Sequence, residues 1–210
     1  MTNNISPEKQ AVTLTEMEFD LLTELFNVGI GRSAAALSEM LHQEIQLSVP
    51  EISFCSVDEL LERFPNDENI ITVSQDISGP FDMQSMLLFP VSGSLNVIRA
   101  MLGNHLSDEM ATELQQEAFT EIGNIVLNAC IGIIAKMLDD NFVIKLPQFS
   151  DDKAENLFKN SHFNTNQVVM SMQVDLTLTT NQISGHIAFV LGSVSMDSIK
   201  LQLNKMLENV

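Results

Sequence analysis

The sequence predicts an α+β fold made of two copies of one unit, with two long helices packed on a mainly antiparallel sheet. Three observations lead to this fold class. The pattern Glu-x2-Asn-x22-Pro occurs twice, 97 residues apart. Each copy begins in a long stretch of helical periodicity, and each is followed by two strand-like runs and a shorter helix. Each half therefore has the order helix, strand, variable connection, two long strands, helix.

The first half opens with a predicted helix from Thr15 to His42. The Thr15 hydroxyl can cap its first turn, and Glu18, three residues later, completes a capping box. Gly29 and Gly31 are poor helix formers, so we expect close packing or a local irregularity at these two positions.

Shorter elements complete the first half. Alternating apolar residues predict a strand over 44–49 that ends at Pro50, and Ser56 can cap a short helix over 56–64. A hairpin of two strands, over 70–77 and 83–89, surrounds a Gly-Pro turn. A helix over 95–102 then ends at Gly103.

The second half repeats this order. Its predicted elements are a long helix over 107–139, a strand over 142–146 that leads to Pro147, a strand pair over 167–178 and 182–191, and a closing helix over 196–207. A single half would bury one face of its small sheet with difficulty, whereas two halves can join their sheets. We therefore expect a mobile tail over 1–12 and one domain over 13–210, built of repeats over about 13–103 and 104–210.

Composition limits the partners. The 210 residues include 28 acidic and 10 basic side chains, a formal net charge of −18, which disfavours nucleic acid and anionic lipid. No run of about 18 uninterrupted apolar residues predicts a membrane span, and the N-terminus lacks the apolar core of a secretory signal, so a cytoplasmic protein is expected. Cys55 and Cys130 are expected to be buried free thiols, and the scattered histidines predict no zinc site.

The repeated motif places polar side chains on one face of each long helix. In both copies an acidic residue precedes the Glu by four positions, giving a stripe at i, i+4 and i+7 that should face solvent. The stripes are Asp20, Glu24 and Asn27 in the first copy and Glu117, Glu121 and Asn124 in the second. A single Glu-x-x-Asn usually marks only the wet side of an amphipathic helix. Asn is a mediocre helix former, however, and it recurs at the same distance from Pro50 and Pro147, which favours a functional interpretation.

An exposed carboxamide can donate to or accept from a water molecule and so fix its direction. Hydrolysis of a phosphoryl group depends largely on aligning such a water and stabilising charge. The neighbouring Glu could dock on a basic residue of the partner that carries the phosphoryl group. The chain has no phosphate-cradling glycine loop, no Ser-His pair and no carboxylate spacing typical of magnesium sites, so no cofactor of its own is expected.

The motif Asp/Ser-x3-Glu-x2-Asn-x22-Pro resembles that of the CheC, CheX and FliY family of chemotaxis phosphatases, and the doubled motif is most similar to the two-site CheC-like branch. The resemblance implies removal of the aspartyl phosphate from CheY-type response-regulator receivers, with magnesium held by the receiver. It assigns water direction to Asn27 and Asn124, receiver contact to Glu24 and Glu121, and a structural role to Pro50 and Pro147. The first copy fits fully through Asp20, while Glu117 is longer than the Asp or Ser that the motif has there.

Two other functions stay open at this stage. The chain could be a non-catalytic module that captures a phosphorylated receiver or a CheD-like deamidase through its acidic face. It could also be a flagellar or signalling scaffold whose motifs are silent. Loss or retention of receiver dephosphorylation in Asn27→Ala/Asn124→Ala separates the enzyme from both alternatives.

Overall fold

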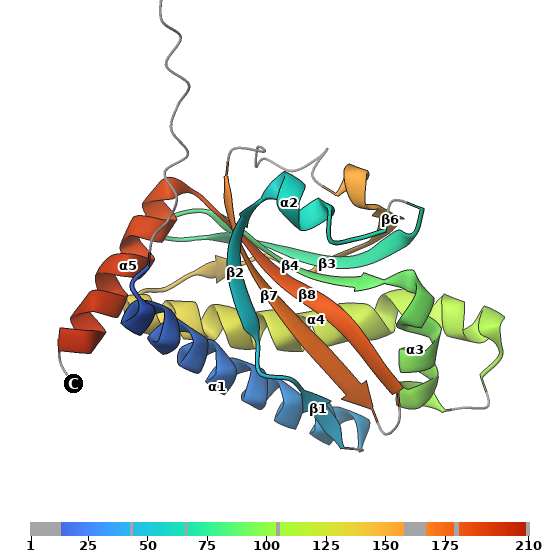
Figure 1. The fold of residues 1–210 in the computed structure, drawn as a ribbon. Coiled ribbons are helices and arrows are strands. Elements are labelled where there is room, and N and C mark those ends of the chain that lie inside the picture. The colour runs from blue at the N-terminus through green and yellow to red at the C-terminus, as the bar shows by residue number, and fades with distance from the viewer. Residues whose placement is uncertain are drawn as a thin grey trace, which may run out of the picture.

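A computed structural model describes residues 14–42, 44–65, 67–103, 106–157, 167–178 and 181–208 (Figure 1). The tail expected over 1–12 lies outside these ranges. Two long helices dominate the fold: α1 (Glu16–Leu41) and α4 (Asp108–Leu138). Both agree with their predicted extents.

Both long helices begin and end as the local chemistry requires. The Thr15 hydroxyl accepts from the backbone N–H of Glu18, whose carboxylate accepts from the Thr15 N–H, so the predicted capping box is confirmed. The Ser107 hydroxyl caps α4 by accepting from the backbone N–H of Met110. The helices end at His42 and Asp139, with left-handed φ angles of 52° and 51°. These two positions are 97 residues apart, which is the same distance in sequence as that between the two copies of the motif.

Within the described part of the chain, eight strands form one antiparallel sheet. The strands are β1 (Ile45–Leu47), β2 (Glu51–Ser56), β3 (Asn69–Ser78), β4 (Met83–Pro90), β5 (Val143–Ile144), β6 (Gln148–Lys153), β7 (Val168–Leu178) and β8 (Asn181–Leu191). The order is β1-β7-β8-β4-β3-β5, with β2 also paired to β7 and β6 also paired to β3. The two predicted strand pairs, now β3 with β4 and β7 with β8, are confirmed.

The sheet joins the halves by exchanging strands. β1 and β2 of the first half pair with β7 of the second, while β5 and β6 of the second half pair with β3 of the first. Equivalent strands of the two halves are exchanged. Ile52 pairs with Met172, and Phe149, which lies 97 residues after Ile52, pairs with Val73.

The strands before and after the two prolines differ from prediction. The strand expected over 44–49 is shortened to β1, and the one expected over 142–146 is shortened to β5. The strands β2 and β6, which follow the prolines, were not predicted. Both lie along the outside of a long strand of the other half, and periodicity within a short segment does not identify such a distant partner.

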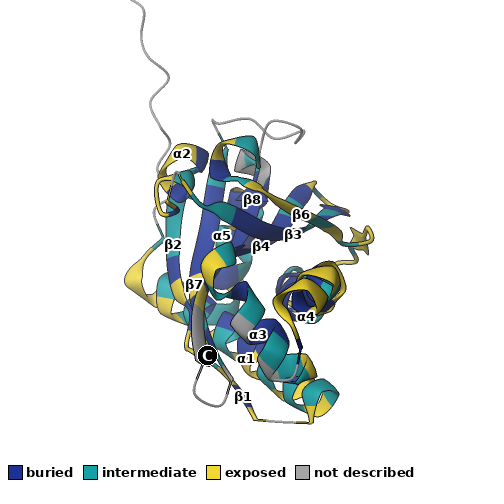
Figure 2. Ribbon diagram, turned by 90° about the vertical axis from the view of Figure 1, so that its right-hand side faces the viewer, coloured by how far each residue is buried: buried dark blue, intermediate teal, exposed yellow. Residues whose placement is uncertain are grey.

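Helices cover both faces of the sheet. The helices α1, α4, α3 (Ser94–Leu102) and α5 (Ser193–Glu208) lie on one face, and α2 (Val57–Leu61) with the short turn Ala154–Asn156 lies on the other (Figures 1 and 2). Alternation along β4 serves both cores, since Leu87 and Phe89 join the core beneath the long helices while Met86 and Leu88 join the opposite one. The predicted helices over 56–64, 95–102 and 196–207 correspond to α2, α3 and α5.

The long helices cross closely at Gly29. A Cβ there would lie 3.0 Å from a side-chain carbon of Ile133 on α4 and 3.5 Å from the backbone oxygen of Ala129, so close packing at Gly29 is confirmed. The same expectation is wrong for Gly31, around which a Cβ would meet nothing within 4 Å. Cys130 is fully buried, and burial raises the pKa of its thiol to about 12, whereas Cys55 is only half-buried; both are free.

By length and composition alone, α4 could cross a membrane, and 56% of its most apolar window is buried inside the fold. A buried core helix satisfies the same test. The apolar side of α4 packs on the sheet and the exposed side carries the acidic stripe (Figure 2).

Candidate active site

The first motif lies on the exposed face of α1. Asp20 and Glu24 are exposed and Asn27 is half-buried. Leu22 and Phe26, between them in sequence, are completely buried on the opposite side. The helical phasing inferred from the sequence is therefore right for this stripe, and its polar ends are open to a macromolecular partner.

The second motif has the same exposure on α4. Glu117 and Glu121 are exposed and Asn124 is half-buried. Beside Asn124, Gly123 lies so close to β3 that a Cβ would come within 2.5 Å of a Val73 methyl carbon. Tight packing of the helix on the sheet thus fixes the backbone from which Asn124 projects.

One hydrogen bond distinguishes the second motif. The side-chain Nδ2 of Asn128 donates to Oδ1 of Asn124 at 2.8 Å, across one helical turn. Gly31 stands at the position equivalent to Asn128 in the first repeat. The described residues therefore give the Asn27 amide no comparable partner. Sequence reasoning missed Asn128, although its place four residues after Asn124 was the available signal.

The prolines interrupt the pairing of the exchanged strands. Between β1 and β2, three residues that end at Pro50 face two residues of β7, and between β5 and β6, three residues that end at Pro147 face two residues of β3. Each break is therefore a one-residue bulge, where a residue without an N–H fits. The backbone N–H of Ser48 donates to the carbonyl of Asp175 in one bulge, and that of Lys145 donates to Asp76 in the other, both at 3.0 Å. The prolines are thus bulge residues. The expectation that the strand region ends at each proline is wrong, because β2 and β6 continue the pairing beyond them.

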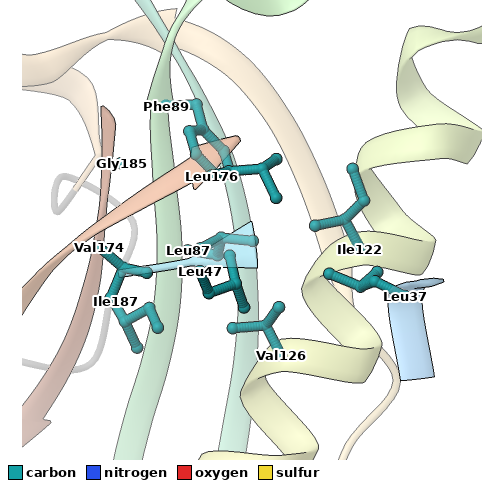
Figure 3. A pocket seen from close by; sticks show the side chains of 10 residues that line it. All are labelled: Leu37, Leu47, Leu87, Phe89, Ile122, Val126, Val174, Leu176, Gly185 and Ile187. Carbon is teal, nitrogen blue, oxygen red and sulfur yellow. The ribbon is translucent and has the colours of Figure 1, made fainter. Parts of the chain in front are cut away.

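Neither of the two cavities found among the described residues is lined by a motif residue. The core between the long helices and the sheet contains an apolar void of about 10 Å³, lined by carbon atoms only (Figure 3). It is at the lower limit for a single water and offers that water no polar partner. A larger polar cavity of about 230 Å³ lies between β3, β4 and β6, and no motif residue lines it. Chemistry at the motifs must therefore take place on the helix surface.

Among the described residues, no group of three His, Cys, Asp or Glu side chains is arranged to hold a metal ion. Each motif instead brings a carboxylate and a carboxamide to one exposed helix face, three residues apart. The carboxylate can pair with a cation on a partner, and the amide can hold a water by accepting or donating a hydrogen bond. The two motifs offer the same chemistry on two helices.

No protein-family model matches the chain. The chain is 25% identical over 143 residues to the CheY-P phosphatase CheC of Bacillus subtilis (strain 168), covering 66% of this chain and 68% of CheC. It is 23% identical over 137 residues to the flagellar motor switch phosphatase FliY of the same organism, covering 64% of this chain and 36% of FliY. The chain thus matches only about a third of the length of that second relative.

Solved structures share the fold. Thermotoga maritima FliY superimposes with a TM-score of 0.68 at 18% identity, covering 92% of this chain and 98% of that chain. FliM from the H. pylori FliM-SpeE complex gives a TM-score of 0.63 at 11% identity, covering 92% and 97%. The structural matches show the fold alone. Together with the two sequence relatives, they confirm the resemblance to the CheC, CheX and FliY family and the mixed helix and antiparallel sheet fold.

Proposed function

We propose that this chain, a relative of the CheC, CheX and FliY phosphatases, hydrolyses the aspartyl phosphate of a CheY-type receiver by directing a water molecule with Asn27 and Asn124. The observation that carries the proposal is the exposure of the same carboxylate and carboxamide pair on α1 and on α4. The sequence similarity to CheC, which is named as a CheY-P phosphatase, supports the choice of substrate.

In this mechanism a receiver docks on one long helix, where Glu24 or Glu121 pairs with a basic side chain of the receiver. The Asn amide oxygen accepts a hydrogen bond from a water and thereby aims the water oxygen at phosphorus. The new P–O bond forms as the bond to the aspartate oxygen breaks, in line with the attack. The products are the free aspartate carboxylate and inorganic phosphate, which has gained the oxygen and both protons of the water.

The chain supplies position and charge, and the receiver supplies the rest. We propose that the magnesium ion that neutralises the phosphoryl oxygens belongs to the receiver, since each motif face holds only two carboxylates. We propose that this activity takes place in the cytoplasm, as expected from the sequence.

The test measures phosphate release from a receiver charged with acetyl phosphate in the presence of magnesium. We expect the Asn27→Ala/Asn124→Ala variant to lose at least about 90% of the acceleration, because removal of a water-directing group typically costs about 10²-fold or more. Gln116→Ala, an exposed change on α4 outside the stripe, serves as the matched control. Full acceleration in the double variant would refute the proposal.

The competing function is a non-catalytic module that binds a phosphorylated receiver or a CheD-like deamidase. FliM from H. pylori shares this fold, and a shared fold does not by itself establish a shared activity. Tight receiver binding by the wild type without faster dephosphorylation would favour this alternative.

A further inference from the structure

The hydrogen bond between Asn128 and Asn124 has no role in the motif as proposed above. It joins two amides one turn apart on the exposed face of α4, with a donor-to-acceptor distance of 2.8 Å. Asn128 itself is exposed and Asn124 is half-buried, so Asn128 lies at the wetter end of the pair.

The bond restricts how the Asn124 amide can turn. A terminal amide rotates broadly about its last side-chain bond, and its oxygen and nitrogen exchange places in a half turn. With Asn128 donating to the Asn124 oxygen, the Asn124 Nδ2 is directed away from Asn128. One of the two acceptor sites on that oxygen stays available for a water.

The first repeat lacks this restraint. Gly31 occupies the equivalent position on α1, it is exposed, and a Cβ there would meet nothing within 4 Å. The space in which an Asn side chain could reach back to Asn27 is therefore open. The two motifs agree at Glu and Asn and differ at the residue that could orient the Asn.

We propose that Asn128 is a positioning residue for Asn124 and that it makes the second site the more active of the two. This inference rests on the proposed function. In water an i,i+4 amide pair stabilises a helix only slightly. Once a docked receiver excludes water, the same bond strengthens. Because the bond already holds the Asn124 amide in one orientation, the entropy cost of fixing that amide for the attack is reduced.

The test isolates each site. In an Asn27→Ala background only the second site acts, and we expect Asn128→Ala to lower kcat by about two- to tenfold, the factor that a typical hydrogen bond contributes. The KM should change little, because in this proposal Asn128 acts on the orientation of Asn124 and supplies no charge that attracts the receiver. Asn128→Gln keeps an amide donor and should restore most of kcat.

The reciprocal variant gives an independent check. In an Asn124→Ala background only the first site acts, and Gly31→Asn should raise kcat by a similar factor. Asn is a better helix former than Gly and the site is open, so this variant should fold. Far-ultraviolet circular dichroism of every variant verifies that α1 and α4 are intact.

The outcomes separate the two levels of inference. An unchanged kcat in Asn27→Ala/Asn128→Ala, beside a large loss in Asn27→Ala/Asn124→Ala, would overturn the role of Asn128 and leave the proposed function standing. A second site that is slower than the first would also overturn it. Full activity of Asn27→Ala/Asn124→Ala would refute the proposed function itself, and the role of Asn128 with it.

Discussion

Substitutions of exposed side chains on the long helices are expected to change receiver binding without changing folding. Glu24 and Glu121 are exposed, and exposed helix substitutions usually change the free energy of unfolding by less than about 0.5 kcal/mol. We expect Glu24→Lys/Glu121→Lys to keep the melting temperature of the wild type and to raise the KM for a phosphorylated receiver about five- to tenfold, because attraction becomes repulsion at the docking face.

The matched control for this charge change is on the other side of the sheet. Glu62 is exposed at the end of α2. Glu62→Lys therefore changes the net charge by the same amount as Glu24→Lys or Glu121→Lys does, without altering the long helices. An equal rise in KM for a Glu62→Lys variant would mean that overall charge, and not the stripe, attracts the receiver.

His186 makes stability depend on pH. Burial lowers the pKa of its imidazole to about 4, Arg63 contributes in the same direction and Asp175 opposes. Its ring packs edge-on against Phe64, with centroids 5.1 Å apart. The unfolded chain takes up a proton near pH 6.5 and the folded chain only near pH 4, so stability from this group is complete above the higher pKa and is lost as pH falls between them.

A His186→Met variant isolates this effect. Methionine carries no titratable group, and its flexible apolar side chain can fill the space left by the imidazole ring. We expect the wild type to lose on the order of 1 kcal/mol more than His186→Met between about pH 6.5 and pH 4.5, a value discounted because the ring is partly exposed. Urea unfolding at both pH values measures it, and equal losses would contradict the assignment.

At the residue scale, the sequence predicts which motif side chains are exposed, but it does not predict how an amide side chain is rotated. The spacing i, i+4, i+7 fixes which side of a helix a residue occupies, so the exposure of Asp20, Glu24, Glu117 and Glu121 followed directly. Rotation of the Asn124 amide depends on a contact with Asn128, and only the geometry displays it. The roles of all motif residues stay predictions until the variants are assayed.

At the scale of elements, helix ends were predictable because their chemistry is local. Thr15 with Glu18, and Ser56 with Glu59, form capping boxes that can be read from neighbouring residues. The strand β6 is the opposite case. Its sequence includes Asp151 and Asp152, which lie outside the usual composition of strands, and it exists because it pairs with β3.

The contact of α4 with β3 gives a prediction for a whole element. A Cβ at Gly123 would lie 2.5 Å from one Val73 methyl carbon and 2.6 Å from its Cβ, and a β-branched side chain cannot turn away easily. We expect Gly123→Ala to lower the free energy of unfolding by about 1–3 kcal/mol and to reduce activity at the second site, because α4 must shift away from the sheet.

A double-mutant cycle tests whether this contact is the cause. Val73→Ala removes the obstructing methyl groups, so Gly123→Ala should cost less in a Val73→Ala background than alone. Chemical denaturation of the four proteins measures the coupling. Strictly additive losses would show that the glycine is needed for another reason.

At the scale of the whole molecule, the doubled order of elements was predictable and the exchange of strands was not. Recurrence of the motif at a fixed spacing shows that two similar units exist, and periodicity gives their helices and hairpins. Neither says whether a short strand returns to its own hairpin or crosses to the other one. Both alternatives expose the same apolar pattern, and only the long-range pairing of Ile52 with Met172 and of Phe149 with Val73 distinguishes them.

The exchange predicts that neither half is stable alone. In a fragment of residues 1–103, β1 and β2 would lack β7, β3 would lose β5 and β6 on its outer edge, and β4 would lose β8. The helix core would also be opened, because α1 packs on α4. The free energy lost with this many strand pairings exceeds the roughly 5–15 kcal/mol by which a domain of this size is stable.

Hydrogen exchange of the two fragments tests this prediction. We expect the fragments 1–103 and 104–210 to show little amide protection separately and to regain it when they are mixed. Slow exchange in β3 and β4 of the first fragment alone would mean that its hairpin and helices suffice, and that the crossed strands add little to the stability of the sheet.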